Sequence, residues 1–324
     1  MFKLVTKPTV FPAVAVGGAA CQIVPASSSS APKVEVGELQ VNPDIKLRHM
    51  VYRPAHRKGT VLLLHGFPET MYAWKPIAES LSSDYEVHAF DWPGYGQSSR
   101  PGADRFGYAP LDYAHVLADY VRTSGIDSSK LVIYATDIGA LPALLAALEQ
   151  PDIASEIIVG DFAPFNRPQY MYESLQGLKS KPSSDAVRAA MNKNRDEILA
   201  NTFFRGMSAE ERYALPREFT DDMAKGWGGD VTSADAFFHY YSHFTRDQDY
   251  FEANMAKLKI PVKVVWGEQD IYIKKEMGVE YANRNGLKLS ILPKLGHFPH
   301  LQAPEQTVDE VRAAFSAGSN PVSD

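Results

Sequence analysis

The chain has 324 residues, 45% of them hydrophobic, and a formal net charge of −6 at pH 7. This length accommodates one large catalytic domain with an inserted subdomain, and the hydrophobic content is sufficient for a substantial core. The negative charge and the lack of a long Lys/Arg run argue against nucleic acid as a partner, because that binding depends on neutralising phosphates. No stretch of about 18 apolar residues is present, so no membrane-spanning segment is expected. We expect a small apolar or mildly polar organic substrate, and the sequence makes no prediction of oligomeric state.

The N-terminal segment is the one candidate for a targeting signal. Lys3 and Lys7 precede an apolar run at 10–20, and the single cysteine, Cys21, follows two glycines and two alanines. This pattern resembles a bacterial lipoprotein signal, in which the cysteine is lipidated. Two locations stay open: export with a lipid anchor at Cys21, or the cytoplasm if the segment is only an extension. Four serines follow before the folded body, so residues 1–33 are predicted to be a leader and a Ser-rich linker.

From residue 34 onward, apolar runs alternate with helical patterns. Segments 34–41 and 46–53 are predicted as antiparallel strands, and the continuous apolar run at 61–64 is typical of a buried central strand. Helices and strands then alternate, with helices predicted at 72–81, 111–122 and 140–148, and strands at 86–90, 131–134 and 156–159. This rhythm indicates an α/β fold with a mostly parallel sheet flanked by helices.

The alternation stops after Pro164. Residues 165–255 carry helix-like patterns and many aromatic residues, without a convincing strand. The strand and helix rhythm then resumes, with strands predicted at 262–266 and 288–292 and helices at 275–282 and 304–315. We therefore predict an α/β core made of residues 34–164 and 256–324, with residues 165–255 inserted as a helical cap.

Residues 135–139, Ala-Thr-Asp-Ile-Gly, lie between a short apolar strand and an alanine-rich helix. This context is typical of a nucleophile elbow, whose tight turn needs small flanking residues and raises the central residue above the sheet. Serine is the usual occupant, whereas this chain has Asp137. A carboxylate is nucleophilic at neutral pH without a general base, so it suits attack on a saturated carbon in a strained ring or bearing a leaving group. The alternative interpretation is that Asp137 is only the N-cap of the following helix.

Two further segments complete a catalytic set. Asp270 ends a predicted strand, and His297 follows the next strand, so the order nucleophile, acid, histidine is that of the hydrolases with a nucleophile elbow. His297 would activate water, and Asp270 would fix its tautomer. Asp161, which ends the strand before the cap, is an alternative acid.

The loop after the strand at 61–64 begins with His65-Gly66-Phe67-Pro68-Glu69. Backbone N–H groups of Phe67 and Ile138 are predicted to form an oxyanion hole, which stabilises negative charge during ester formation and hydrolysis. No His, Cys, Asp and Glu cluster has metal-ligand spacing, and neither a G-x-G-x-x-G sequence nor a P-loop is present. We therefore expect no cofactor and no metal.

Together these motifs resemble the Asp-nucleophile branch of the α/β-hydrolases, which contains epoxide hydrolases and haloalkane and haloacetate dehalogenases. The oxyanion loop at 65–69, followed by Met-Tyr-Ala-Trp at 71–74, is most similar to epoxide hydrolases. The resemblance implies an α/β-hydrolase fold with a cap, an alkyl-enzyme ester on Asp137, and hydrolysis of an epoxide to a diol.

Departures from the dehalogenase patterns narrow the prediction. Ile138 and Phe67 occupy places where haloalkane dehalogenases hold the halide, and no arginine shortly follows Asp137 as it does in haloacetate dehalogenases. Asp161, however, stands where one dehalogenase subgroup places its acid. A dehalogenase of either type, with a halide site built from Trp227, His239 or His243, is therefore the alternative function. A non-catalytic binding module on the same fold is the second alternative.

The cap supplies the remaining site predictions. In epoxide hydrolases, two cap tyrosines protonate the opening epoxide oxygen, and the resemblance places Tyr240 and Tyr241 on a substrate-lining helix. The candidate proton donors are Tyr170, Tyr172, Tyr213, Tyr240 and Tyr241, and Tyr240 is the first choice. The predicted substrate-binding residues are His65, Trp227, Tyr240 and Tyr241.

Overall fold

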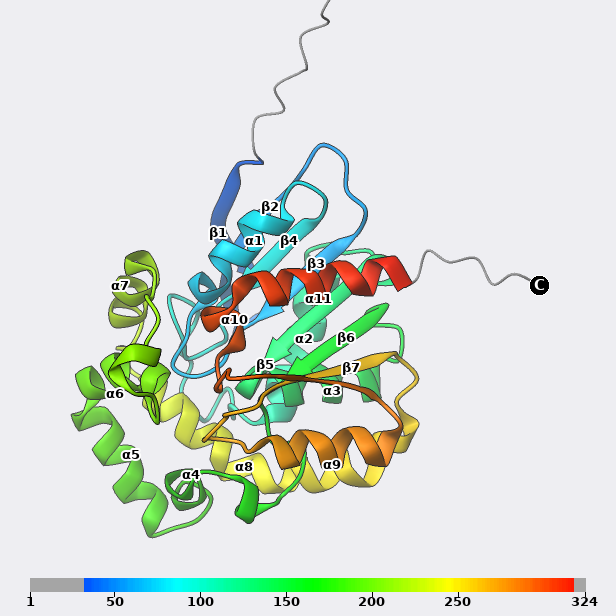
Figure 1. The fold of residues 1–324 in the computed structure, drawn as a ribbon. Coiled ribbons are helices and arrows are strands. Elements are labelled where there is room, and N and C mark those ends of the chain that lie inside the picture. Colours follow the sequence, from blue (N-terminus) through cyan, green and yellow to red (C-terminus); the bar gives the residue numbers. More distant parts are fainter. Residues whose placement is uncertain (1–31, 318–324) are drawn as a thin grey trace, which may run out of the picture. The chain divides into compact units, whose positions relative to one another are not determined.

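The computed structural model describes residues 32–317 (Figure 1). The predicted lipoprotein signal and Cys21 lie outside these residues. Among the helices of the described part, none combines the length and the apolar character needed to cross a membrane.

The centre of the described chain is an eight-stranded sheet with the order β1-β2-β4-β3-β5-β6-β7-β8. Strand β2 pairs antiparallel with β1 and β4, and all the other neighbouring strands are parallel. This topology confirms the predicted α/β-hydrolase fold with a mostly parallel sheet. The strands are β1 (Val34–Gln40), β2 (Lys46–Tyr52), β3 (Thr60–Leu64), β4 (Glu86–Phe90), β5 (Leu131–Thr136), β6 (Glu156–Gly160), β7 (Val262–Gly267) and β8 (Lys288–Leu292).

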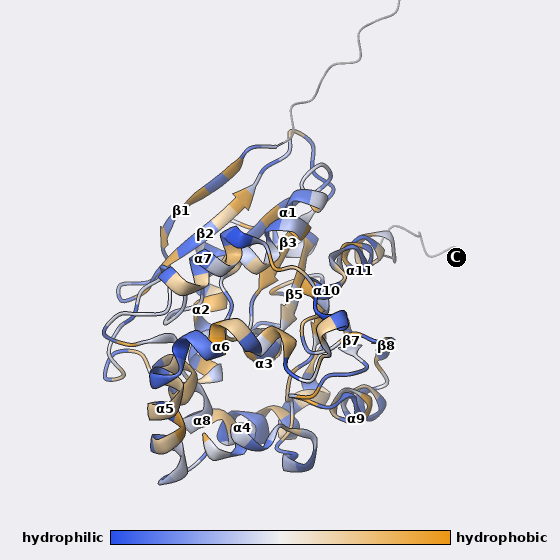
Figure 2. Ribbon diagram, turned by 60° about the vertical axis from the view of Figure 1, so that its left-hand side comes forward, coloured by the Kyte–Doolittle hydropathy of each residue, from blue (hydrophilic) through white to orange (hydrophobic). Residues whose placement is uncertain are grey.

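Continuous apolar runs form the middle strands because both faces of the sheet are covered. Every residue of β3 and β5 is buried. Successive side chains of a strand point to opposite faces, so Leu62 and Leu64 pack into one hydrophobic cluster while Val61 and Leu63 pack into the other. The hydropathy colouring of Figure 2 shows hydrophobic strands enclosed by helices of mixed character.

Helices of the core cover the two faces of the sheet. Buried residues of α1 and α11 belong to one hydrophobic cluster, whereas those of α2, α3 and α9 belong to the other, so the two sets of helices lie on opposite faces (Figure 1). The core helices are α1 (Lys75–Leu81), α2 (Pro110–Thr123), α3 (Ala140–Glu149), α9 (Lys275–Asn285), α10 (Pro299–Gln302) and α11 (Pro304–Ala317).

Between β6 and β7 the regular secondary structure is helical, and one isolated bridge joins Met171 of this segment to Ile273, which follows β7. The longest helix, α8, buries Phe237, Tyr240, Tyr241 and Phe244, and it contacts α2 and α3 of the core. The α-helices of this segment are α4 (Glu173–Gly177), α5 (Ser183–Lys193), α6 (Arg195–Asn201), α7 (Arg217–Lys225) and α8 (Ser233–Asn254). They form a lid of helices over the carboxyl ends of the parallel strands, where α/β sheets bind ligands.

A buried ion network joins this helical segment to the sheet. Arg48, which is 6% exposed on β2, donates to Asp91 at 2.5 Å and to both carboxylate oxygens of Asp222 on α7 at 2.7 and 2.6 Å. Asp91 also accepts the backbone N–H groups of Met71 and Gln97. Since one guanidinium fork holds carboxylates from two parts of the chain, the network fixes α7 against the core.

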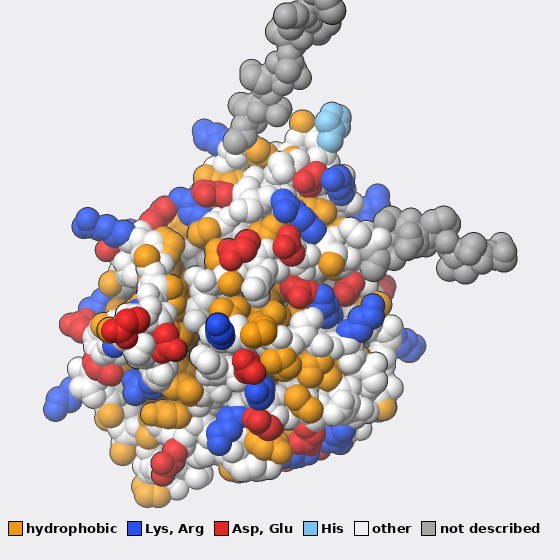
Figure 3. Space-filling view, in the orientation of Figure 1, with side chains coloured by type: hydrophobic (Ala, Val, Ile, Leu, Met, Phe, Trp, Pro, Cys, Tyr) orange, Lys and Arg blue, Asp and Glu red, His pale blue; other side chains and the backbone are white. Residues whose placement is uncertain are grey.

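The molecular face drawn in Figure 3 intersperses acidic and basic side chains, with hydrophobic side chains between them. A face of this kind has no continuous basic stripe that could follow the phosphates of a nucleic acid.

Candidate active site

Asp137 lies at the sharp turn between β5 and α3. Its backbone has a φ of 48°, a left-handed conformation that is costly for a residue other than glycine. The loop after β3 approaches so closely that a Cβ on Gly66 would lie 2.6 Å from the Cβ of Asp137, so only glycine fits there. The turn and this close approach hold the Asp137 carboxylate above the ends of β3 and β5.

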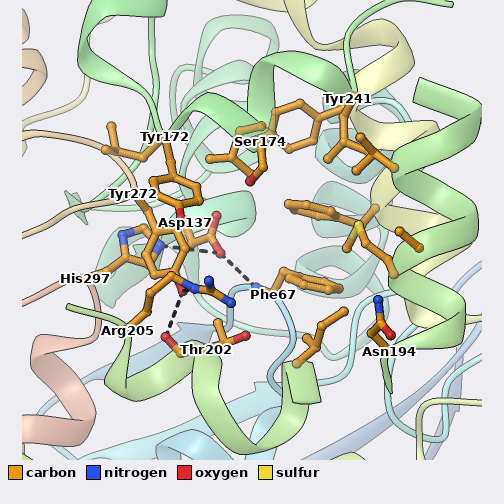
Figure 4. A pocket seen from close by; sticks show the side chains of 18 of the residues that line it. Phe67, Asp137, Tyr172, Ser174, Asn194, Thr202, Arg205, Tyr241, Tyr272 and His297 are labelled. Carbon is orange, nitrogen blue, oxygen red and sulfur yellow. Dashed lines mark hydrogen bonds and ion pairs between the residues drawn. The ribbon is translucent and has the colours of Figure 1, made fainter. Parts of the chain in front are cut away.

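The structure brings His297 and Asp270 to this carboxylate. His297 Nδ1 lies 2.8 Å from Asp270 Oδ2, and its Nε2 lies 3.8 Å from Asp137 Oδ2. The other oxygen of Asp270 accepts the backbone N–H groups of Tyr272 and Ile273 at 2.8 and 3.0 Å. Figure 4 shows the imidazole of His297 beside Asp137. Asp270 is therefore fixed in a position where it orients the ring of His297.

Charges around His297 decide its protonation state. Burial by itself lowers the pKa of His297, but the charges of Asp270 and Asp137, with their hydrogen bonds, raise that pKa well above its usual value. The ring is consequently an imidazolium at neutral pH, paired with both carboxylates. Removing the charge of Asp137 would remove part of the interaction that retains this proton.

Asp161 also reaches this cluster, from the end of β6. It is 1% exposed, has a φ of 50°, and accepts the backbone N–H of Gly267 at 2.9 Å. Burial, followed by the charge of Asp270, raises the pKa of Asp161 well above its ordinary value, which favours the protonated acid as a hydrogen-bond donor to Asp270. The direct bond to His297 belongs to Asp270, and the geometry therefore favours Asp270 over the alternative acid.

Asp161, Asp270 and His297 are also the one group of metal-ligand residue types in 32–317 compact enough for an ion, with ligand atoms within 4.8 Å of one another. Their arrangement is that of an acid and a histidine bonded to each other, and we assign no metal to it.

The predicted oxyanion loop lies against the nucleophile. The backbone N–H of Phe67 donates to Asp137 Oδ2 at 2.9 Å. Ile138 follows Asp137 in the turn, and its carbonyl accepts the hydroxyl of Tyr240 at 3.2 Å. The Phe67 N–H therefore points to the position where negative charge develops on a carbonyl oxygen of Asp137.

Two residues that the sequence analysis did not single out support this loop. Glu69 and His300 are both fully buried; Glu69 accepts the backbone N–H of Gly66 at 2.7 Å and binds His300 Nε2 at 2.7 Å. Burial raises the pKa of Glu69, but the charge and hydrogen bond of His300 lower it by more, so the net pKa is below the usual value and the carboxylate is charged. The imidazole of His300 stacks on Trp74 with a centroid distance of 4.3 Å. In the sequence, the indication of this support was Glu69, the last residue of the 65–69 loop motif.

His65 requires a correction, because the structure does not place it against a substrate. It is fully buried; its Nδ1 bonds to the carbonyl of Gly66 at 2.8 Å and its Nε2 accepts the backbone N–H of Trp92 at 3.1 Å. Burial also lowers its pKa, which keeps the ring neutral. His65 therefore positions the oxyanion loop, and its predicted substrate contact is replaced by this role.

A cavity of about 380 Å³ lies above Asp137, between the sheet and the lid helices. Its apolar walls come mainly from the lid helices, and polar side chains gather near His297 (Figure 4). It is lined by Phe67, Asp137, Tyr172, Ser174, Leu175, Leu178, Val187, Ala190, Met191, Asn194, Glu197, Ile198, Thr202, Arg205, Phe237, Tyr241, Tyr272, Ile273, His297 and Phe298.

The predicted cap residues divide into two groups. Tyr241 lines the cavity, and burial together with the charge of Asp137 raises the pKa of its phenol well above the usual value. Tyr240 is 1% exposed, gives its hydroxyl to Ile138, and borders only a small hollow beside Asp137. Trp227 is 4% exposed and packs against the ring of Phe67, outside the cavity lining. Tyr241 is therefore the one of these two tyrosines of α8 that faces the cavity, and Trp227 packs outside its lining.

Residues 61–310 match the alpha/beta hydrolase family, and the match covers most of the chain. This chain belongs to the alpha/beta hydrolase family. It is an enzyme of this fold, and it is similar to epoxide hydrolases and to a dehalogenase, the types that its motifs resemble.

The relatives of this hydrolase include both types. Epoxide hydrolase 4 of Mus musculus is 24% identical over 79% of this chain and 73% of its own length. A fluoroacetate dehalogenase of Burkholderia sp is 36% identical, over 32% of this chain and 34% of its own. The solved structure of epoxide hydrolase CorEH matches with a TM-score of 0.72 at 18% identity and covers 88% of this chain and 99% of that one. The structural match shows the shared fold.

Proposed function

We propose that this hydrolase opens epoxides to diols through an ester formed on Asp137. The observation that carries the proposal is the Asp137 carboxylate itself, which stands in a strained elbow, 2.9 Å from the Phe67 N–H and 3.8 Å from His297, at the floor of a cavity lined by tyrosines. A carboxylate in this position attacks a strained ring directly, since it carries no proton that a base must first remove.

In the first step, an oxygen of Asp137 attacks an epoxide carbon, and the bond between that carbon and the epoxide oxygen breaks. The departing oxygen takes the phenolic proton of Tyr241. Tyr172, which enters the cavity from the segment before α4, is the second candidate donor. Because the pKa of Tyr241 is raised, the phenol keeps its proton until a stronger base, the developing alkoxide, forms beside it.

Ester formation prepares His297 for the second step. It neutralises Asp137, whose negative charge helps to raise the pKa of His297. The imidazolium then transfers its proton to the tyrosinate, and the neutral ring becomes a general base. Asp270, bonded to Nδ1, keeps Nε2 directed at the ester.

In the second step, His297 takes a proton from water, and the hydroxide oxygen attacks the carbonyl carbon of the Asp137 ester. The N–H of Phe67 stabilises the negative charge on the carbonyl oxygen. Collapse breaks the ester bond, and the diol oxygen receives the proton from His297. The new carboxylic acid on Asp137 returns its proton to His297, which restores the starting ion pair.

The choice of an epoxide rests on what faces the cavity. An opening epoxide needs a proton donor, and the hydroxyl of Tyr241 is such a donor. The residues proposed for a halide site lie elsewhere: Trp227 packs on Phe67, and the ring of His239 stacks on Tyr108 at 5.9 Å. Dehalogenation is the second candidate, because the fluoroacetate dehalogenase relative shares 36% identity over its matched segment.

The experiment is intact-protein mass spectrometry on a His297→Gln variant mixed separately with epoxides, bromoalkanes and haloacetates. Since water activation is blocked, we expect an adduct with the full mass of the epoxide. The same variant with Asp137→Ala added is the control and should stay unmodified. An adduct that has lost halogen, without one from epoxides, would establish dehalogenation instead; no adduct from any class would favour a binding module.

A further inference from the structure

Arg205 is a cation in the lining of a largely apolar cavity, and its side chain is 36% exposed to solvent. It follows the short helix Thr202–Phe204 and is the one Lys or Arg among the described residues that line the cavity. Figure 4 shows its guanidinium in the cavity, near Thr202 and Tyr272 and on the same side as His297. The proposed epoxide opening assigns no role to this charge.

Hydrogen bonds hold the guanidinium in place. Its Nε donates to the hydroxyl of Tyr272 at 3.2 Å, and that hydroxyl donates to the carbonyl of Thr202 at 2.9 Å. The guanidinium carbon also lies 6.0 Å from the ring centroid of Tyr172, with which Arg205 shares a hydrogen bond. A guanidinium has five N–H donors. Its partners within residues 32–317 are Tyr272, Tyr172 and Glu197, so part of the fork stays available to a ligand.

Glu197 is a weak partner for this cation. It makes one contact with Arg205, at 3.3 Å, and its side chain is 52% exposed to solvent. Exposed pairs of this kind contribute little, because solvent screens them. Glu197 nevertheless shows that a carboxylate fits the open edge of the guanidinium. A ligand carboxylate sheltered by the cavity can take its place.

The charges that line the cavity favour a ligand whose group at Arg205 carries a single negative charge. One guanidinium can pair bidentately with one carboxylate. A doubly charged phosphate would instead face the carboxylates of Asp137 and Glu197 with no further Lys or Arg among the described lining residues. The other walls are apolar and suit a hydrocarbon body: Leu175, Leu178, Val187, Met191, Ile198 and Phe237.

We propose that Arg205 binds a carboxylate of the substrate, and that this hydrolase therefore acts on epoxides carried by apolar carboxylic acids. The proposal rests on the proposed function, since it names the substrate class of the same site. It assigns Arg205 to substrate selection: the guanidinium holds the charged end while Asp137 attacks the ring.

The test compares terminal-epoxide carboxylic acids of increasing chain length with the matching primary amides. The amide has nearly the same shape as the carboxylate and lacks its charge. We expect the wild type to have a higher kcat/KM for an acid than for its amide. Arg205→Gln should lower that ratio by about 10- to 100-fold, which is the range of a hydrogen bond to a charged group. Glu197→Gln should raise the ratio, because it removes the competing carboxylate.

Arg212→Gln is the matched control, since Arg212 is an exposed cap arginine outside the cavity lining and should leave the ratio unchanged. An acid-to-amide ratio near one that Arg205→Gln does not move would overturn the inference. Amide turnover and an Asp137 adduct would show in that case that epoxide opening itself stands. No adduct with either compound in the His297→Gln background would overturn the proposed function and the inference together.

Discussion

The two aspartates beside His297 differ in charge, and this difference predicts opposite effects of the same substitution. Asp270 accepts hydrogen bonds from His297 at 2.8 Å, from two backbone N–H groups and from Asp161. Asp161 itself favours the protonated acid, and it accepts the N–H of Gly267. Asp270→Asn replaces a carboxylate by a neutral group at the imidazolium. Asp161→Asn replaces one neutral group by another, and its amide can still accept from Gly267 and donate to Asp270.

The magnitudes follow from these contacts. Losing the charged partner of a catalytic histidine lowers turnover by about 10⁴-fold, or about 5.5 kcal/mol of activation free energy. Asp161→Asn replaces the hydroxyl that donates to the Asp270 carboxylate by an amide N–H, so the hydrogen bond is kept and its strength should change by at most about 1 kcal/mol, or less than about tenfold in rate. Steady-state kcat with an epoxide and the single-turnover rate of ester hydrolysis would measure both. If Asp161→Asn were as damaging as Asp270→Asn, Asp161 would be the ionised acid and the assignment would be refuted.

The raised pKa of Asp161 also predicts a pH dependence of stability. Protonated Asp161 stabilises the folded state fully below the unfolded pKa of about 3.9, and this contribution is lost as pH rises through the folded pKa. Asn does not titrate. Urea unfolding should therefore show Asp161→Asn gaining stability relative to the wild type between pH 4 and 7, and a constant difference would contradict a neutral Asp161.

Three further predictions concern the cap, the oxyanion loop and the ion network. Tyr241→Phe, made in the His297→Gln background, should slow ester formation from an epoxide by about 10²–10⁴-fold because it removes the proton donor. Tyr240→Phe loses only its hydrogen bond to Ile138 and should slow ester formation by less than about tenfold. Equal effects of the two substitutions would count against Tyr241 as the donor. Glu69→Gln removes the charge that holds the oxyanion loop through Gly66 and His300. The Phe67 N–H of that loop would then stabilise the transition-state charge less well, so kcat should fall more than KM rises. A change confined to KM would show that the loop is not displaced. Asp222→Ala should reduce the free energy of unfolding by about 3 kcal/mol, which is the lower end for a broken buried ion pair because Asp91 still binds Arg48. Asp221→Ala, on the exposed side of α7, should change the free energy of unfolding by less than about 1 kcal/mol. Similar urea midpoints for the two variants would contradict a stabilising network.

The sequence by itself determined the features that depend on near neighbours along the chain. Alternating apolar runs and helical patterns predicted the parallel sheet and the helices around it, because strand and helix periodicities are local. The elbow at 135–139 was likewise readable from its small residues and its position between a strand and a helix. These local patterns fixed the fold class and the candidate nucleophile.

Only the tertiary structure decided which side chains meet at the site. β6 and β7 are neighbours in the sheet, so Asp161 and Asp270 both arrive at His297, and hydrogen bonding in three dimensions distinguishes them. Tyr240 and Tyr241 are adjacent on α8, where successive residues point about 100° apart, so the packing of the helix chooses the one that faces the cavity.

The remaining site features join residues that are remote in the sequence. Glu69 and His300 are separated by 231 positions, and Arg205 reaches the cavity of Asp137 from a segment between α6 and α7. No local pattern encodes such contacts, because they arise only when the sheet closes and the lid helices pack over it. Propensity and periodicity act within a few turns of chain, whereas burial, ion pairing and the resulting pKa shifts are properties of the assembled fold.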